Sequence, residues 1–150
     1  MELERVSAPE VAAVRDFLKE ADLTLAGLDA PAVRLWIERD GHGRIVGSTG
    51  FEVSSDGRHA LIRSVAVSAD RRAVGAGTRL ASFAIDRARD DGVDRAWLFS
   101  RRSGPFWQKL GFTGADCDEL AAALPDTHQV RLFIETGQLA REVAWQAFLR

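Results

Sequence analysis

Residues 68–78 form the most informative segment of the chain and read Ser68-Ala69-Asp70-Arg71-Arg72-Ala73-Val74-Gly75-Ala76-Gly77-Thr78. The apolar segment before it, residues 61–67, predicts a central strand covered on both faces. The segment after it, residues 78–90, repeats its apolar side chains at helical spacing and predicts a helix that ends at Gly92. Glycines at a helix N-terminus expose N–H donors to a phosphate, and neighbouring arginines add positive charge. A diphosphate is the predicted ligand, and a plain tight turn is the alternative that these residues leave open.

Spacing excludes two familiar phosphate-binding loops. Walker A requires a Gly-Lys pair, and the chain contains none. The dinucleotide fingerprint requires glycine or alanine at position 80, where the chain has Leu80. ATP hydrolysis and NAD binding therefore lose support.

The residues on either side of this region predict an alternation of strands and helices. On the N-terminal side we expect a strand at residues 3–7, a helix from about 8 to 21, and strands at 33–39, 44–53 and 59–68. Residues 23–31 are compatible with either a loop or a short helix. On the C-terminal side we expect a strand at 94–100, a helix at 106–110, helical turns at 119–124, a last strand at 128–136 and a helix at 138–150. This order predicts one α/β domain, residues 1–150, with a mixed sheet.

Composition narrows the class of protein. A chain of 150 residues with 46% apolar residues can close a core without disulfides or metal, and its net charge of -2 argues against a general nucleic-acid binder. The single cysteine, Cys117, excludes an internal disulfide and Cys-rich zinc sites, so we expect no metal and a packing role for its thiol. No apolar stretch approaches the ~20 residues of a membrane span, and the N-terminus has no signal-peptide pattern. We therefore expect a cytoplasmic protein without membrane association.

Two motifs carry a resemblance to a known family. Arg72-Ala73-Val74-Gly75-Ala76-Gly77 resembles the [Q/R]-x-x-G-x-[G/A] signature of the GCN5-related N-acetyltransferase (GNAT) superfamily, and Phe106-Trp107-Gln108-Lys109-Leu110-Gly111-Phe112 resembles its F-Y-x-K-L-G-F segment. The resemblance extends over residues 3–136 and implies the GNAT fold, a mixed, mostly antiparallel sheet that splays between its fourth and fifth strands and is flanked by helices. The segments around Glu52 and residues 61–67 look like a branch of this superfamily found with arsenic-resistance genes.

The resemblance implies that acetyl-CoA donates an acetyl group to the amine of a small molecule, which attacks the thioester directly in a ternary complex. The pyrophosphate is expected on the glycine loop and the pantetheine arm along the fourth strand. The residues expected to bind coenzyme A are Val65, Ala66, Val67, Arg71, Arg72, Ala73, Val74, Gly75, Ala76, Gly77, Thr78, Ser100, Phe106 and Trp107. The resemblance to this superfamily also leads us to expect that the protein forms a homodimer.

The expected catalytic groups lie on neighbouring strands. A backbone N–H near Val65 or Ala66 is expected to polarise the thioester carbonyl. Glu52 is the candidate for the amine's proton, and a solvated strand glutamate is the alternative. Arg63 and Ser64 interrupt an apolar strand, so we expect them to face the acceptor cleft or to pair with Glu52. His128 is assigned no role.

Trp107 occupies the position where the resembling enzymes commonly keep the tyrosine that protonates the leaving sulfur, and the chain contains no tyrosine at all. An indole N–H donates hydrogen bonds but is no practical acid. An alkyl thiol has a pKa near ~8.5, so the sulfur can leave as a thiolate near neutral pH. The missing tyrosine keeps a second hypothesis open: an acyl-CoA-binding sensor or regulatory domain with weak or no transferase activity.

Overall fold

The computed structural model describes residues 3–71 and 75–149. Within them, seven strands form one sheet in the order β1-β2-β3-β4-β5-β7-β6. The strands are β1 (Glu4–Arg5), β2 (Val33–Arg39), β3 (Ile45–Val53), β4 (His59–Val67), β5 (Arg95–Phe99), β6 (Thr113–Ala115) and β7 (Ala144–Phe148). The α-helices are α1 (Val11–Glu20), α2 (Ala76–Asp90), α3 (Gly104–Lys109), α4 (Cys117–Ala123) and α5 (His128–Thr136). Short 3-10 helices are η1 (Ala8–Glu10), η2 (Ala69–Arg71) and η3 (Gln138–Arg141).

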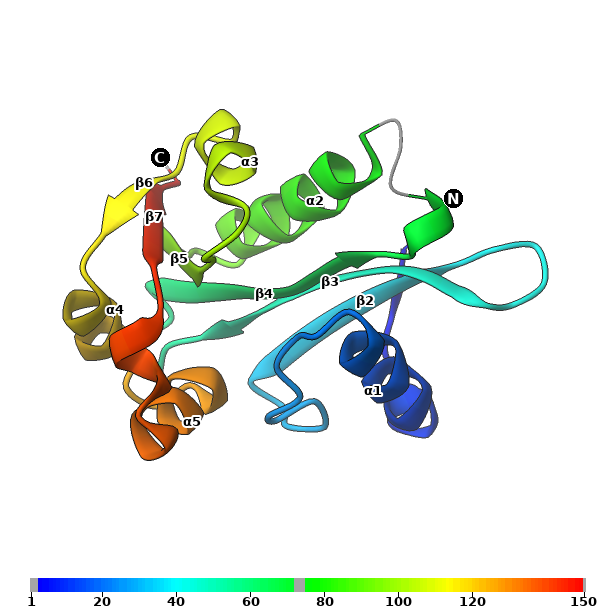
Figure 1. Ribbon diagram of the computed structural model, residues 1–150, viewed down its shortest axis with the longest axis horizontal. Helices are drawn as coiled ribbons and strands as arrows, with labels where there is room; N and C mark the ends of the chain where they lie inside the picture. The colour runs from blue at the N-terminus through cyan, green and yellow to red at the C-terminus, as the bar shows by residue number, and fades with distance from the viewer. Residues whose placement is uncertain (1–2, 72–74, 150) are drawn as a thin grey trace.

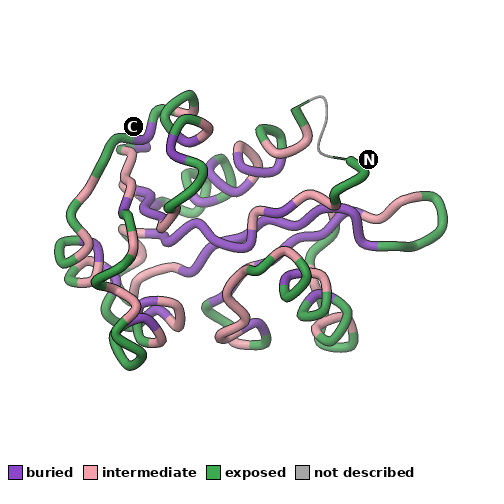
Figure 2. Tube along the Cα trace, in the orientation of Figure 1, coloured by how far each residue is buried: buried purple, intermediate pink, exposed green. Residues whose placement is uncertain are grey.

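The sheet lies between two layers of helices (Figure 1). Helices α2 and α3 cover one face, and α1 and α5 lie against the other. On the first face, Trp36, Phe51 and Ile62 of the sheet pack against Ala81 and Ala84 of α2. The central strands β3 and β4 are buried along most of their length because helices cover both of their faces (Figure 2).

Strands β4 and β5 are parallel and separate part of the way along. Their pairing comprises His59 with Arg95, Ala60 with Ala96 and Leu61 with Trp97, whereas β4 continues to Val67. All the other neighbouring strands in the sheet are antiparallel. The sheet is therefore mixed, mostly antiparallel and splayed beyond Leu61, which confirms the expected fold class.

Most of the expected elements are present, with ends shifted by a few residues. Residues 23–31 contain turns and no helix. The expectation of a last strand at residues 128–136 is wrong, since these residues form α5. Val130 and Phe133 are buried three residues apart, as in a helix. The Glu52 carboxylate accepts hydrogen bonds from the first backbone N–H groups of α5, and Gly137 (φ +75°) ends the helix. Nothing in the sequence near residues 128–136 indicates that a carboxylate from β3 would accept hydrogen bonds from the start of this helix.

The expectation of a C-terminal helix at residues 138–150 is also wrong. The short helix η3 is followed by β7, which pairs with β5 through five residue pairs from Arg95–Phe148 to Phe99–Ala144. β6 then pairs with the other edge of β7. Pairing with β7 gives hydrogen-bond partners to the backbone groups of β5 on the edge that faces away from β4. This long-range contact outweighs the local helical preference of residues 138–150. The last element of the described residues is therefore a strand, β7, which lies between β5 and β6 in the sheet.

Candidate active site

The N-terminus of α2 lies directly after the loop that follows β4. Gly75 precedes the helix in the left-handed region at φ +75°, and a Cβ atom there would meet nothing within 4 Å. Backbone conformation, rather than crowding, therefore requires glycine. Two contacts hold this end of α2 on the sheet: the Thr49 hydroxyl donates to the Leu80 carbonyl (2.7 Å), and the Arg79 guanidinium makes a fork with Glu38 (2.7 and 2.8 Å).

The residues expected to hold coenzyme A are only partly described. Arg72, Ala73 and Val74 lie outside the described residues. Arg71 ends η2 and is exposed. The first turn of α2 approaches α3, because a Cβ atom on Gly77 would lie 3.6 Å from the Phe106 ring.

β4 contains a bulge at the point where it leaves β5. The β3–β4 register passes from Gly50–Arg63 to Ser48–Ala66, so Ser64 and Val65 together face Thr49. Ser64 has φ +61°, and its carbonyl accepts a hydrogen bond from the Ser48 hydroxyl (2.6 Å). A bulge redirects backbone groups, and this one lies on the strand expected to polarise the thioester.

An inner cavity of about 130 Å³ follows the separation of β4 and β5. It brings together four of the predicted site residues, Ser64, Val65, Ser100 and Trp107. Its complete lining is Leu23, Thr24, Ile62, Arg63, Ser64, Val65, Leu98, Phe99, Ser100, Ser103, Trp107 and Gln129. Ala66 and Val67 lie further along β4 and are not part of it. Trp107 is buried, and its ring packs edge to face on Phe106 and Phe112.

An outer cavity of about 300 Å³ continues the inner one. Both are lined by Leu23, Thr24, Phe99, Ser100, Ser103 and Gln129. The outer cavity adds Ala21, Asp22, Arg101, Arg102, Phe133, Gln138 and Glu142. We call the two cavities together the cleft. Its walls come from strands β4 and β5, the turns after α1 and β5, and helices α3, α5 and η3.

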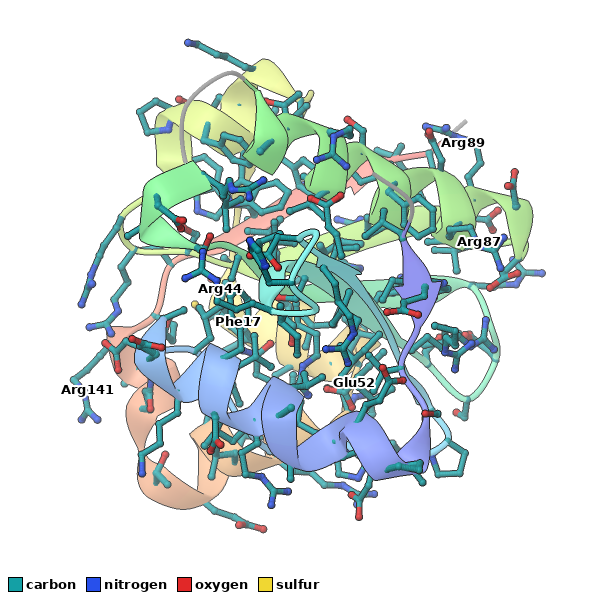
Figure 3. The ribbon with its side chains drawn as sticks, turned by 90° about the vertical axis from the view of Figure 1, so that its right-hand side faces the viewer. Phe17, Arg44, Glu52, Arg87, Arg89 and Arg141 are labelled. Carbon is teal, nitrogen blue, oxygen red and sulfur yellow. The ribbon has the colours of Figure 1, made fainter. Side chains whose placement is uncertain are left out.

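Glu52 lies beside the cleft without lining either cavity. Figure 3 shows it on the side of the sheet that also carries α1. The Arg63 guanidinium donates to its carboxylate at 2.9 Å, and each of the two side chains is only 1% exposed. Burial lowers the pKa of the Arg63 guanidinium, and the adjacent Glu52 charge opposes that shift. The expected pairing of Arg63 with Glu52 is thereby confirmed.

Arg63 and Glu52 also hold two walls of the cleft. Arg63 donates to the Ala26 and Thr24 carbonyls (2.7 and 3.0 Å) in the turn after α1. Glu52 accepts hydrogen bonds from the backbone N–H groups of His128 (2.7 Å) and Gln129 (3.3 Å) at the start of α5. The ion pair thus fixes the two segments that face each other across the cleft.

Sequence reasoning missed two residues of α5. His128 places its Nδ1 atom 2.9 Å from Glu52 Oε1, and its ring lies so close to Gly27 that a Cβ there would come within 2.4 Å. Gln129 lines both cavities and donates from Nε2 to the Thr24 hydroxyl oxygen (2.8 Å). The segment was expected to be a strand, and the contacts of both residues depend on the start of a helix lying against the Glu52 carboxylate.

Cys117 is not a candidate nucleophile. Burial is the main cause that raises the pKa of its thiol, and a raised pKa disfavours the nucleophilic thiolate.

Within residues 3–71 and 75–149, no three His, Cys, Asp or Glu side chains lie close enough together to hold a metal ion. Among the same residues, no helix has the length and apolar character needed to cross a bilayer.

A splayed sheet with a glycine-bounded helix N-terminus beside the opening is the architecture of acyl-CoA N-acyltransferases. The acetyltransferase (GNAT) family model matches residues 2–112, most of the chain. The chain therefore belongs to the GNAT acetyltransferase family. The residues beyond 112 add β6, α4, α5 and β7, which complete the sheet and the cleft.

Solved structures share this fold at low sequence identity. N-acetylglutamate synthase from Neisseria gonorrhoeae, complexed with coenzyme A and N-acetyl-glutamate, matches 100% of this chain at 22% identity and TM-score 0.73, and the match spans only 36% of the synthase. Rv2747 from Mycobacterium tuberculosis, in complex with CoA, matches over 100% of both chains at 18% identity and TM-score 0.76. Tetrahymena GCN5 matches 100% of this chain and 97% of its own at 11% identity and TM-score 0.73. No curated protein matches the chain.

Proposed function

We propose that this protein is an N-acetyltransferase that moves the acetyl group of acetyl-CoA to the amine of a small molecule by direct attack in a ternary complex. The observation that carries the proposal is the cleft at the separation of β4 and β5, with the Ser64–Val65 bulge at its base. Its cavities, of about 130 and 300 Å³, suit a small acceptor. The synthase that shares the fold was solved with N-acetyl-glutamate in one complex and L-arginine in another.

The chain's residues fit acetyl-CoA as substrate. The backbone N–H groups in the first turn of α2, which follow Gly75, point out of the helix at its N-terminus and can bind the pyrophosphate. The edge of β4 beyond Leu61 does not pair with β5 and is open to the pantetheine arm. A backbone N–H at the Ser64–Val65 bulge then polarises the thioester carbonyl. As the acceptor nitrogen bonds to this carbon, the carbon–sulfur bond breaks, the sulfur leaves as thiolate, and the amine loses a proton. The role of Glu52 in taking that proton stays a prediction.

The test separates an enzyme from a sensor. Acetyl-CoA should raise the melting temperature of the full chain, because a ligand that binds only the folded state stabilises it. Release of free thiol should then be measured across a panel of amino acids, polyamines and aryl amines. No thermal shift at millimolar acetyl-CoA would contradict the proposal, and binding without thiol release would favour the sensor. Membership of the arsenic-resistance branch, a cytoplasmic location and a homodimer also stay predictions.

Trp107 provides a test of how the thiolate leaves. Trp107→Phe should change kcat by less than about threefold, because an indole N–H is not an acid. Trp107→Tyr should raise kcat by up to about tenfold below pH 8, because a phenol can protonate the departing sulfur. The measurement is kcat against pH for wild type and both variants, with the KM for acetyl-CoA as control. A tenfold loss of kcat in Trp107→Phe at unchanged KM would show that the indole takes part.

A further inference from the structure

We propose that the acceptor carries a carboxylate beside its amine, and that Arg101 and Arg102 bind this carboxylate at the outer end of the cleft. The inference rests on the proposed function and names its substrate class. In this arrangement the amine reaches inward to Gln129 and the Ser64–Val65 bulge. Three features of the cleft carry the inference: two loosely paired arginines, one buried acceptor atom without a donor, and lining charges of both signs.

Arg101 and Arg102 follow β5 directly and both line the outer cavity. Each faces one carboxylate at a distance beyond the usual hydrogen-bond range: Arg101 Nε lies 3.5 Å from Glu142 Oε2, and Arg102 Nη2 lies 3.8 Å from Asp22 Oδ2. The arginine side chains are 50% and 81% exposed. Both guanidinium groups therefore keep N–H donors that can bind a ligand carboxylate in bidentate fashion.

Gln129 supplies the inner end of the arrangement. Its Nε2 donates to the Thr24 hydroxyl oxygen, which fixes the amide plane. Its Oε1 is buried and accepts no hydrogen bond from the described residues. A buried acceptor without a donor is unfavourable, and the N–H groups of a bound amine can satisfy it. Gln129 shares the inner cavity with Ser64 and Val65, so an amine held there lies beside the expected position of the thioester.

The distribution of charge favours a zwitterion over a simple amine. The outer cavity is lined by Asp22 and Glu142 as well as by the two arginines. An amine alone would leave each guanidinium group with only its distant carboxylate, Glu142 or Asp22, whereas an amine with a carboxylate gives both guanidinium groups an anion to bind. Phe99 and Phe133, whose rings are 5.0 Å apart, add an apolar wall for the remainder of the molecule. The size of the cavity fits an amino acid.

The test compares amines that share a side chain and differ in the carboxylate. The pairs are L-leucine and 3-methylbutylamine, L-phenylalanine and 2-phenylethylamine, and L-lysine and 1,5-diaminopentane. With saturating acetyl-CoA and the full chain, thiol release should give at least one pair in which kcat/KM is tenfold or more higher for the amino acid. In Arg101→Gln/Arg102→Gln, that advantage should fall about tenfold or more through KM for the amino acid, with KM for acetyl-CoA unchanged. Gln129→Met should lower kcat/KM for both members of the pair.

The matched control is Arg131→Gln/Arg141→Gln, which removes two exposed arginines that line neither cavity; Figure 3 shows Arg141 at the edge of the molecule. Equal use of both members of every pair would overturn the inference, and so would a raised KM for acetyl-CoA in the Arg101/Arg102 variant, which would assign these arginines to the cofactor. A thermal shift with acetyl-CoA, combined with no turnover of any amino acid, would also overturn the inference. Absence of acetyl-CoA binding would instead overturn the proposed function.

Discussion

Gly75→Val should weaken acetyl-CoA binding by about 100-fold or more. Gly75 sits at φ +75°, and a β-branched residue strongly disfavours that left-handed conformation. The backbone at the start of α2 must therefore shift, which removes the aligned N–H donors expected to hold the pyrophosphate. Each hydrogen bond to a charged group contributes about 1.5–3 kcal/mol, so losing two corresponds to at least two orders of magnitude in Kd. Calorimetric titration with acetyl-CoA measures the loss.

A second glycine separates loss of binding from general strain. Gly57 has φ +74° in the turn between β3 and β4, and a Cβ atom there also meets nothing within 4 Å. Gly57→Val therefore imposes the same backbone strain at a distance from the cleft. We expect it to lower the melting temperature about as much as Gly75→Val and to leave the Kd for acetyl-CoA within twofold. If both variants bind acetyl-CoA like the wild type, the pyrophosphate does not lie on this loop.

The parts of the site that the sequence predicted are those made by contiguous residues. The segment from residue 61 to residue 90 contains a strand, a glycine turn and a helix, and each has its own local pattern. The position of Trp107 was also predictable from nearby residues, because Ser103-Gly104-Pro105 indicates the start of the short helix after β5. The splay of β4 from β5 was expected through the family resemblance, and the pairing of the two strands confirms it.

The acceptor side could not be predicted because its structure depends on contacts distant in sequence. Residues 128–136 are rich in apolar and β-branched side chains, which suit a strand as well as a helix. The helix forms where the Glu52 carboxylate accepts its first N–H groups, a contact across 76 residues. A strand at this position would have placed Gln129 differently, so the wrong element hid an acceptor-side residue. The orientation of Arg63 toward Thr24 and Ala26 is a tertiary contact of the same kind.

Arg63→Met should destabilise the fold by about 3–5 kcal/mol, because it leaves the Glu52 carboxylate buried without its cation. For a chain of this size, that corresponds to a fall in melting temperature of roughly 10 °C. Denaturant unfolding monitored by tryptophan fluorescence measures it. The matched control is Arg131→Met, since Arg131 pairs with Asp126 at 3.5 Å and both side chains are more than half exposed. The control should change stability by less than about 0.5 kcal/mol.

The double variant Glu52→Gln/Arg63→Met distinguishes a broken ion pair from simple loss of packing. Its destabilisation should be clearly smaller than the sum of the two single changes, because the neutral amide removes the uncompensated charge that Arg63→Met leaves behind. Additive effects would show that Arg63 contributes through its contacts with the Thr24 and Ala26 carbonyls instead.

Glu52→Gln alone tests whether the carboxylate also takes the amine's proton. Both of its oxygens already accept hydrogen bonds, from Arg63 and from the first residues of α5, and a base would have to give one of them up. If Glu52 is the base, Glu52→Gln lowers kcat at least tenfold, removes the acid limb of the pH profile and leaves acetyl-CoA binding intact. If kcat is retained at every pH, the carboxylate only positions α5 and the turn after α1, and the proton passes directly to water.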